Sequence, residues 1–263
     1  MKTEYSQKFL VSANEANPEG ELAVHILVSD IIVVATKAAL ELGIGNPTMA
    51  HLNAGWVLSR LTIEMKSYPK VNTEYRIITW VESWNRHFSV RDFEVQDNDG
   101  NIVGYARSIW MVLNTVTHEN FGLSHLTLPE GAVSKRPCPI SRQEKHIEIY
   151  RHDATDLPSS ALKANTDERR YTFLYNDIDF YRHVNTVRYV SLLLNSYSLD
   201  EFDRFFLSRL ELSFIHEGNF GETVEIRRYN HPDNLSSFSL YSEKKELPIL
   251  FARMQLTARR EKI

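Results

Sequence analysis

A short stretch at residues 176–194, NDIDFYRHVNTVRYVSLLL, carries acid, base and amide side chains directly before an apolar run. Asp179 stands four residues before His183, and Asn185 follows two residues later. The apolar spacing after Val184 predicts a helix. Backbone N–H groups at a helix start lack partners within the helix, so they can stabilise a developing negative charge. The stretch therefore predicts proton-transfer chemistry at a helix N-terminus.

Some of these residues also have purely structural interpretations. Aspartate is a preferred N-cap residue, and Asp177 is interpreted here as a cap. Asn185 either contacts a substrate or stabilises the start of the helix, and the sequence leaves both roles open. Tyr189 and residues 192–194 are predicted to lie in the core because they follow the apolar helical spacing.

The elements that must position this stretch occur in the same order twice along the chain. Residues 21–43 form an apolar run of helical length, closed by Gly43 as the predicted C-terminal cap. A shorter helix is predicted from near Val184. Each helix is followed by four segments rich in β-branched and aromatic residues, which predict strands. These segments are 56–65, 74–84, 88–97 and 104–114, then 205–215, 221–230, 236–244 and 249–260.

The repetition is also visible in the residues themselves. LSRL occurs at 58–61 and again at 207–210, an offset of 207 − 58 = 149. Nearer the end of each half, ARS at 106–108 corresponds to ARM at 252–254, an offset of 252 − 106 = 146, so a loop has lost three residues. An internal duplication is predicted.

A long apolar helix followed by an antiparallel meander describes a helix wrapped by a sheet. The predicted fold class is therefore α+β, with two tandem hot-dog units fused in one chain, and each long helix is expected to be buried on its whole circumference. The predicted domains are an N-terminal unit at 1–127, a proline-containing crossover linker at 128–160, and a C-terminal unit at 161–263 that carries the catalytic residues.

Composition excludes several classes of function. The 263 residues are 43% hydrophobic and 24% charged, with a net charge of −4 and a pI near 6.2, which gives no general attraction to nucleic acid or to a membrane. The single cysteine, Cys138, excludes a disulfide framework. No signal peptide or membrane-spanning run is recognised, so a cytoplasmic protein is expected. No metal and no cofactor are expected, because nucleotide, flavin and metal motifs are missing.

The stretch DIDFYRHVNTVRYV, followed by LSRLELSFIHEGNFGETVEI, resembles the acyl-ACP thioesterase family, whose members have two fused hot-dog units. The family pattern is D-x-N-x-H-V-N-N-x-x-Y, then a strand with an aromatic residue, a basic pair, a Glu and a following Gly-Asp. The resemblance implies an enzyme of fatty acid biosynthesis that releases free fatty acid from fatty acyl-ACP. The matching residues are Asp179, His183, Val184, Asn185, Tyr189, Phe214, Glu217, Gly221 and Glu222.

Two positions depart from the family pattern. Tyr181 stands where the family has an Asn, and a phenol can donate a hydrogen bond but cannot offer both functions of an amide. Plant members often have a Cys directly after the Glu, and this chain has Gly218 there. A thiol nucleophile is therefore not expected.

The resemblance implies a role for each site residue. Glu217 is the candidate for activating a water molecule or for attacking the thioester directly. His183 would position the reacting groups and share the proton transfer, because histidine titrates near neutral pH. Asp179 would orient the imidazole or the water, and Tyr181 is included in the catalytic set. The backbone N–H groups at the start of the 184–195 helix would polarise the thioester carbonyl.

The duplication allows the two halves to be compared at the site. At the offset of 149, Glu217 corresponds to Tyr68, which cannot act as a carboxylate. His183 corresponds to Val34 at that offset, or to Glu21 at an offset of 162. Neither alignment supplies a histidine, so one active site per chain is expected, in the C-terminal half. The first unit would then contribute the pocket for the acyl chain.

Several alternatives remain open at this point. The expected partner is acyl carrier protein bearing a fatty acyl chain, but an acyl-CoA thioesterase uses the same chemistry. Dehydratase-type chemistry also pairs a histidine with an acid, and the order Asp-x-x-x-His followed by Glu fits hydrolysis better. A non-catalytic acyl-binding module is the alternative outside enzymes, with Tyr181 as the residue that favours it. A homodimer is compatible with the sequence.

Overall fold

The computed structural model describes residues 3–141, 143 and 166–259. The chain divides into two compact units, Met1–Arg142 and Gln143–Ile263. The predicted linker at 128–160 is described only at 128–141 and 143, so its boundaries stay predictions.

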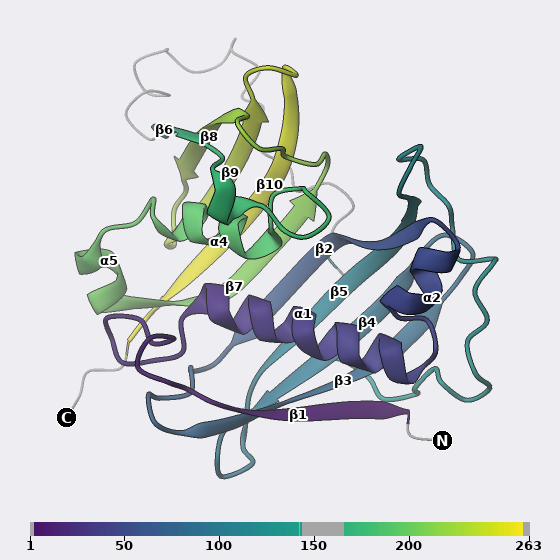
Figure 1. Cartoon of the computed structure of the whole chain (residues 1–263). Coiled ribbons are helices and arrows are strands. Elements are labelled where there is room, and N and C mark those ends of the chain that lie inside the picture. The colour runs from purple at the N-terminus through teal and green to yellow at the C-terminus, as the bar shows by residue number, and fades with distance from the viewer. Residues whose placement is uncertain (1–2, 142, 144–165, 260–263) are drawn as a thin grey trace. The chain divides into compact units, whose positions relative to one another are not determined.

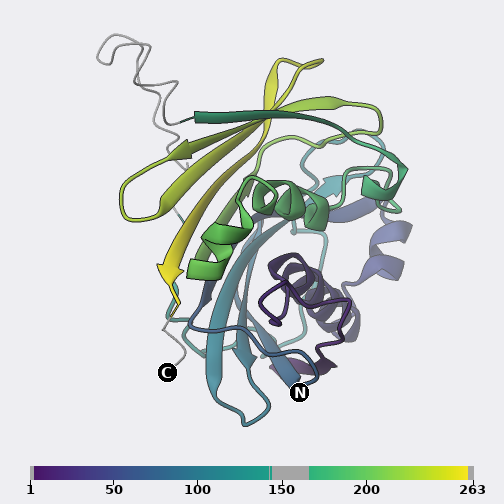
Figure 2. The same ribbon diagram turned by 90° about the vertical axis from the view of Figure 1, so that its left-hand side faces the viewer.

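The first unit is an antiparallel five-stranded sheet with one long helix. Its strands are ordered β1-β3-β4-β5-β2 across the sheet. Figures 1 and 2 show α1 lying along one face of this sheet. Along the chain the elements are β1 (Glu4–Leu10), α1 (Val24–Glu41), α2 (Asn46–His51), β2 (Ala54–Met65), β3 (Glu74–Trp84), β4 (Ser89–Gln96) and β5 (Ile102–Asn114).

The long helix α1 forms because residues 24–41 are mostly apolar and contain no proline or glycine. Gly43, with a φ of 74°, follows the last turn and donates its N–H to the Leu40 carbonyl, as the predicted cap requires. The expectation that α1 is buried all around is wrong. Its buried residues lie on one side, while Thr36 and Lys37 are exposed, because the sheet covers only one face of the helix.

The opposite face of the sheet is covered by the segment at 128–141. Side chains alternate between the faces along β4, so Asp92 points away from α1. On this face the Arg136 guanidinium lies 4.3 Å from the ring centre of Trp80 and pairs with Glu94. The first half of the predicted crossover linker thus completes the core of the first unit.

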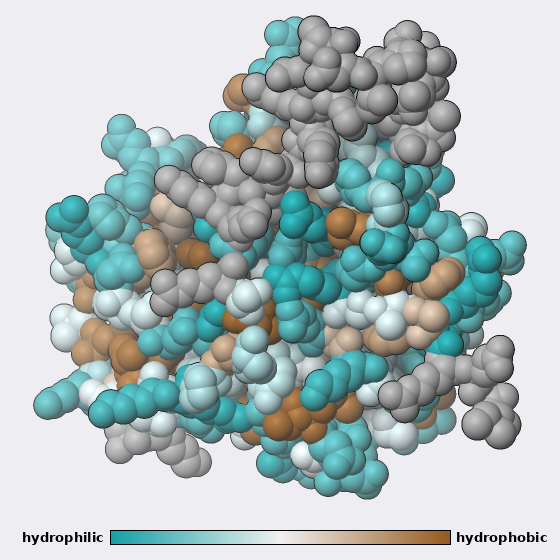
Figure 3. Space-filling view, turned by 180° about the vertical axis from the view of Figure 1, so that it is seen from behind, coloured by the Kyte–Doolittle hydropathy of each residue, from teal (hydrophilic) through white to brown (hydrophobic). Residues whose placement is uncertain are grey.

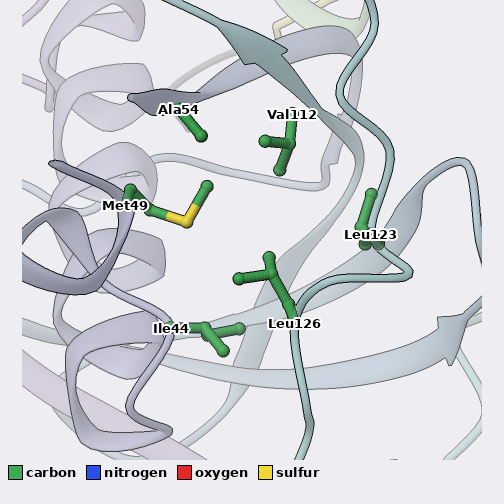
Figure 4. Packing of buried hydrophobic residues seen from close by; sticks show 6 residues of the cluster. All are labelled: Ile44, Met49, Ala54, Val112, Leu123 and Leu126. Carbon is green, nitrogen blue, oxygen red and sulfur yellow. The ribbon is translucent and has the colours of Figure 1, made fainter. Parts of the chain in front are cut away.

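The short helix α2 is held by a cluster of buried apolar side chains, shown in Figure 4. Met49 of α2 packs among residues from the preceding loop, from strands β2 and β5, and from the segment after β5. The other members of the cluster are Ile44, Ala54, Val112, Leu123 and Leu126. A six-residue helix is too short to be stable alone, so this packing maintains it.

The second unit repeats the arrangement of the first. Its strand order, β6-β8-β9-β10-β7, corresponds one to one with that of the first sheet. The elements are β6 (Thr166–Thr172), a 3₁₀ turn η1 (Tyr175–Asp177), α4 (Thr186–Leu194), α5 (Leu199–Arg204), β7 (Phe205–Phe214), β8 (Thr223–Asn230), β9 (Leu235–Ser242) and β10 (Leu247–Ala258).

A β-bulge occurs at the same place in both units and supports the duplication. In β2 the pairing passes from Leu58 to Arg60, so Ser59 lacks a partner residue in β5. In β7 it passes from Leu207 to Arg209, so Ser208 lacks one in β10. Both serines belong to the repeated LSRL, and their offset is 208 − 59 = 149. The residues paired with the two arginines, Ile109 and Gln255, differ by 255 − 109 = 146, the second predicted offset.

The predicted α+β architecture with tandem hot-dog units is confirmed. The eight predicted strands agree with β2–β5 and β7–β10 to within a few residues. The helix expected from near Val184 begins at Thr186. The ranges of the outer strands β1 and β6 and of the short helices α2 and α5 were not predicted.

The described surface has no single dominant apolar region on the face shown in Figure 3, where hydrophobic residues form separate patches among hydrophilic ones. Among the described residues, no helix combines the length and the hydropathy needed to cross a bilayer.

Candidate active site

The loop before α4 is anchored by Asp177, which is 2% exposed. One carboxylate oxygen accepts hydrogen bonds from the Tyr171 hydroxyl at 2.9 Å and from the Leu174 N–H at 2.7 Å. The other lies 2.6 Å from Nε of Arg188, which belongs to α4. Asp177 therefore has the structural role that was expected, although it caps the turn η1 and not α4 itself.

Asp179 holds the next turn of the same loop. Its Oδ1 accepts from the backbone N–H groups of Tyr181 at 2.9 Å and of His183 at 3.3 Å. Its own N–H donates to the His183 carbonyl at 2.8 Å. Arg182, inside this turn, has a φ of 69°, a left-handed conformation that costs energy in a non-glycine residue. These contacts show Asp179 acting on the backbone that carries the imidazole.

His183 and Glu217 come together as a pair. The His183 Nε2 lies 3.1 Å from Oε2 of Glu217, and the two side chains are 27% and 33% exposed. Backbone bonds join the two loops on which they lie. The N–H of Val184 donates to the Gly218 carbonyl at 2.9 Å, and His183 forms an antiparallel bridge with Asn219. The pair is thus partly open to solvent and held by main-chain hydrogen bonds.

Gly218 is required by the close approach of α4. A Cβ at this position would lie 2.5 Å from the Tyr189 hydroxyl and 3.1 Å from a ring carbon of Phe173. The Tyr189 hydroxyl accepts the Gly218 N–H at 3.1 Å, and burial raises the pKa of this phenol. A cysteine, as found in plant members of the family, would collide with Tyr189. The expectation that a thiol is not the nucleophile stays a prediction.

Asn185 is the N-cap of α4. Its side-chain oxygen accepts from the Val187 N–H at 2.9 Å. The N–H groups of Val184 and Asn185 donate to the carbonyls of Gly218 and Asp177. In the described part of the chain, the N–H of Thr186 has no acceptor. Of the helix-start donors expected to polarise a carbonyl, Thr186 is therefore the one left available.

Tyr181 lies on the exposed side of this loop. It is 38% exposed, and its ring centre is 3.9 Å from that of Phe180. Burial and the charge of Asp179 raise the pKa of the phenol, so it is a hydrogen-bond donor at neutral pH. Two further aromatic residues of neighbouring loops, Tyr175 and Phe220, are 85% and 66% exposed.

Lys245 and Glu222 support the loop that carries Glu217. The Lys245 Nζ donates to the Glu217 carbonyl at 2.7 Å and to Glu222 at 3.1 Å, and Glu222 also accepts the Asn219 N–H at 3.0 Å. Burial alone would raise the pKa of Glu222, but hydrogen bonds from Ser242, Lys245 and Asn219 lower it. Sequence reasoning missed Lys245, because nothing in its local sequence links it to a residue 28 positions earlier.

The first unit has the same loop with other residue types at the candidate site positions. There Asn17 accepts the Glu21 N–H at 2.8 Å, as Asp179 accepts that of His183. Glu21 forms the bridge with Lys70 that His183 forms with Asn219, and it pairs with Lys70 as an ion pair. Of the two alignments considered, the offset of 162 is therefore correct, and Glu21 occupies the position of the histidine.

Two family models match the chain. The acyl-ACP thioesterase N-terminal domain matches residues 2–121, and the acyl-ACP thioesterase C-terminal domain matches residues 160–247. These ranges correspond to the first and second units.

Curated relatives are similar over most of this chain. A chloroplastic oleoyl-acyl carrier protein thioesterase of Coriandrum sativum is 24% identical over 230 residues, which is 84% of this chain and 61% of the relative. A chloroplastic palmitoyl-acyl carrier protein thioesterase of Gossypium hirsutum is 24% identical over 227 residues, 81% of this chain and 52% of the relative. The chain thus spans about half to three fifths of the length of these relatives.

Solved structures agree in fold. An acyl-ACP thioesterase from Bacteroides thetaiotaomicron superposes with a TM-score of 0.84 at 25% identity, covering 97% of this chain and 98% of that one. A 12:0-ACP thioesterase from Umbellularia californica has a TM-score of 0.77 at 17% identity, with 98% and 99% covered. With its two matched domains, this chain belongs to the acyl-ACP thioesterase family.

Proposed function

We propose that this protein hydrolyses the thioester of fatty acyl-ACP, releasing a free fatty acid and the carrier thiol. The observation that carries the proposal is the His183–Glu217 pair, 3.1 Å apart and partly open to solvent, beside the first turn of α4. The relatives named as acyl carrier protein thioesterases support the choice of carrier.

In the proposed reaction Glu217 is the general base. Its carboxylate removes a proton from water while the water oxygen bonds to the thioester carbonyl carbon. The Thr186 N–H, at the positive end of α4, stabilises the oxyanion. The C–S bond then breaks, and the proton returns to the carrier thiolate through His183. His183 also holds the Glu217 carboxylate through the hydrogen bond between them.

Direct attack by Glu217 is the competing route. The carboxylate oxygen would then displace the thiolate and form a mixed anhydride, which water would hydrolyse. After a single turnover in ¹⁸O-water, label in Glu217 identifies the anhydride route. General-base catalysis puts ¹⁸O only into the fatty acid, whereas hydrolysis of the anhydride at its side-chain carbonyl leaves ¹⁸O in Glu217.

The other predicted site residues have supporting roles in this proposal. Asp179 positions His183 through the backbone, since its carboxylate accepts the His183 N–H. Tyr181 donates its phenolic hydrogen bond to the bound thioester in place of the family Asn. Asn185 contacts the substrate with its amide nitrogen while its oxygen caps α4. A cytoplasmic location and a homodimer stay predictions.

The test is thiol release from acyl-ACPs and from acyl-CoAs of 8 to 18 carbons. Glu217→Gln and His183→Asn should each lower kcat for acyl-ACP by about 100-fold or more, because general acid–base catalysis contributes about 10²–10⁴. Glu225→Gln is the matched control. Glu225 pairs with Arg227 at 2.7 Å on β8, away from the site loops, and its variant should retain activity within about 3-fold.

Three results would contradict the proposal. Cleavage of acyl-CoA alone would exclude the carrier protein as the natural thioester. Tight binding of acyl-ACP without thiol release would show a non-catalytic acyl-binding module. Full activity in a correctly folded Glu217→Gln variant, checked by circular dichroism, would exclude Glu217 as base and as nucleophile.

A further inference from the structure

The first unit contains a small cavity between α1 and its sheet. Its volume is about 50 Å³, which is room for a few water molecules or for the end of a chain. Three of the four tryptophans of the chain line it, together with two alanines of α1 and one arginine of β4. These residues are Trp56, Trp84, Trp110, Ala35, Ala39 and Arg91.

The packing explains why this space stays open and largely apolar. Ala35 and Ala39 are small, so α1 passes the indole rings without filling the gap. The N–H of Trp56 donates to the Ile44 carbonyl at 2.8 Å, and that of Trp110 to the Ser108 hydroxyl at 2.7 Å. With their polar atoms satisfied elsewhere, the rings present apolar surface to the cavity.

Arg91 is a buried charge in this apolar wall. It is 6% exposed, and its side chain donates one long hydrogen bond, 3.4 Å, to the Thr79 hydroxyl. Among the described residues no carboxylate pairs with it. Burial lowers the pKa of the Arg91 guanidinium to about 10, so it remains charged at neutral pH. A buried guanidinium without a partner is costly.

Arg107, the other buried arginine of the same sheet, has hydrogen-bond partners for its guanidinium and serves as a comparison. Arg107 on β5 donates to Asp92 at 3.0 Å, to Glu82 at 2.9 Å and to the Ile140 carbonyl at 2.6 Å. Arg91 lies one strand away, on the opposite face, with none of these contacts. The fold therefore supplies acids for Arg107, whereas Arg91 has no carboxylate partner among the described residues and only one long hydrogen bond, to Thr79.

Arg91 also borders a second hollow, which contains Glu4 and Glu41. Glu4 pairs with Arg136 at 3.2 Å, and Glu41 is exposed near the end of α1. Neither carboxylate forms an ion pair with Arg91 in the described part of the chain. The described lining of the tryptophan-lined cavity contains no carboxylate, so a ligand that accepts hydrogen bonds from Arg91 meets no acid there.

We propose that this cavity receives the far end of an acyl chain bearing oxygen, a hydroxyl or a carboxylate, which accepts hydrogen bonds from Arg91. The inference rests on the proposed function, because it takes the first unit to hold the acyl chain. A guanidinium binds a carboxylate with two parallel hydrogen bonds and a hydroxyl with one. A site built to bond an oxygen discriminates against the chain that lacks it, since its donors would stay unpaired.

The test compares acyl-ACPs of 8 to 16 carbons that end in a methyl, a hydroxymethyl or a carboxylate group. For the best length, kcat/KM should favour an oxygenated chain over the methyl-ended chain of equal length by about 10-fold or more. Arg91→Met should reduce this ratio to about 1. Arg91→Lys should keep part of the preference for the hydroxyl and lose more of that for the carboxylate. Arg76→Met, on β3, should leave the ratio unchanged.

Fluorescence supplies a readout that does not need turnover. The indole rings line the cavity, so free hydroxy or dicarboxylic acids should change the tryptophan emission, and Arg91→Met should weaken their binding by about 10-fold or more. Variants that replace one of the three tryptophans by phenylalanine show which indole ring gives the change in emission. Thioester cleavage with no preference for oxygen, or with a preference that Arg91→Met preserves, would overturn the inference alone. Binding of oxygenated acids without any cleavage would overturn the proposed function alone.

Discussion

At the residue scale, the site depends on one very close contact. Gly218 follows Glu217 directly, and its N–H donates to the Tyr189 hydroxyl. No larger side chain fits, because a Cβ on residue 218 would lie only 2.5 Å from the Tyr189 hydroxyl oxygen. The position of the Glu217 backbone is thus determined by a tyrosine on α4 that the sequence predicted only as core.

Gly218→Ala is expected to lower the free energy of unfolding by about 1–3 kcal/mol through overpacking. Tyr189→Phe removes the oxygen that the new methyl group would strike, so the double variant should be more stable than the sum of the single changes predicts. Urea denaturation of all four proteins measures this coupling. Effects that add to within about 0.5 kcal/mol would show that the hydroxyl is not the obstacle.

At the element scale, the start of α4 positions the candidate site. Asn185 ends the extended loop and caps the helix, which leaves the Thr186 N–H available at the first turn. The corresponding helix of the first unit is twice as long, 18 residues against 9, and its N-cap residue, Ala23, forms no side-chain cap. The shorter helix therefore relies more on its cap.

Asn185→Ala should lower the free energy of unfolding by about 1 kcal/mol, whereas Asn185→Asp should retain the cap. The aspartate variant separates the two roles of this residue. If the amide nitrogen contacts the substrate, Asn185→Asp loses kcat/KM at unchanged stability; if Asn185 is a cap alone, both stay close to wild type. Parallel unfolding and steady-state measurements decide between them.

The helices and strands differ in how well the sequence predicted them. Strands β2–β5 and β7–β10 were predictable because β-branched and aromatic residues dominate them. Strand β6 was not, since TDERRYT is mostly polar. The helices α2 and α5 have six residues each, too few for a periodic signal. At the site, His183 and Glu217 were identified by resemblance to a family, but contacts from Lys245 and Tyr189 arise only from folding.

At the scale of the whole molecule, the two units share a backbone plan and differ in side chains. The common bulge at Ser59 and Ser208 and the common loop before each helix show that the plan was retained. An ion pair between Glu21 and Lys70 now occupies the loop of the first unit. Under the proposed function, this difference predicts one catalytic centre per chain.

Glu21→Gln and Lys70→Met are therefore expected to keep kcat within about 3-fold of wild type, since the pair, an exposed Lys70 on a buried Glu21, lies in the unit that lacks the histidine and glutamate of the proposed site. The equivalent change in the second unit, His183→Asn, should abolish most turnover. If Glu217 attacks the thioester directly, the burst of thiol release should equal one equivalent per chain. A loss of about 100-fold in Lys70→Met at normal stability would contradict a single centre.

The unused loop of the first unit also has a consequence for protein engineering. Its hydrogen bonds already hold Asn17, Glu21 and Tyr68 at backbone positions that correspond to those of Asp179, His183 and Glu217 in the second unit. A functional graft therefore needs few changes, because the scaffold geometry is inherited and only the chemistry is missing. The minimal graft is Asn17→Asp, Glu21→His and Tyr68→Glu. A bivalent enzyme built this way would measure how much of a catalytic centre resides in its backbone and how much in its side chains.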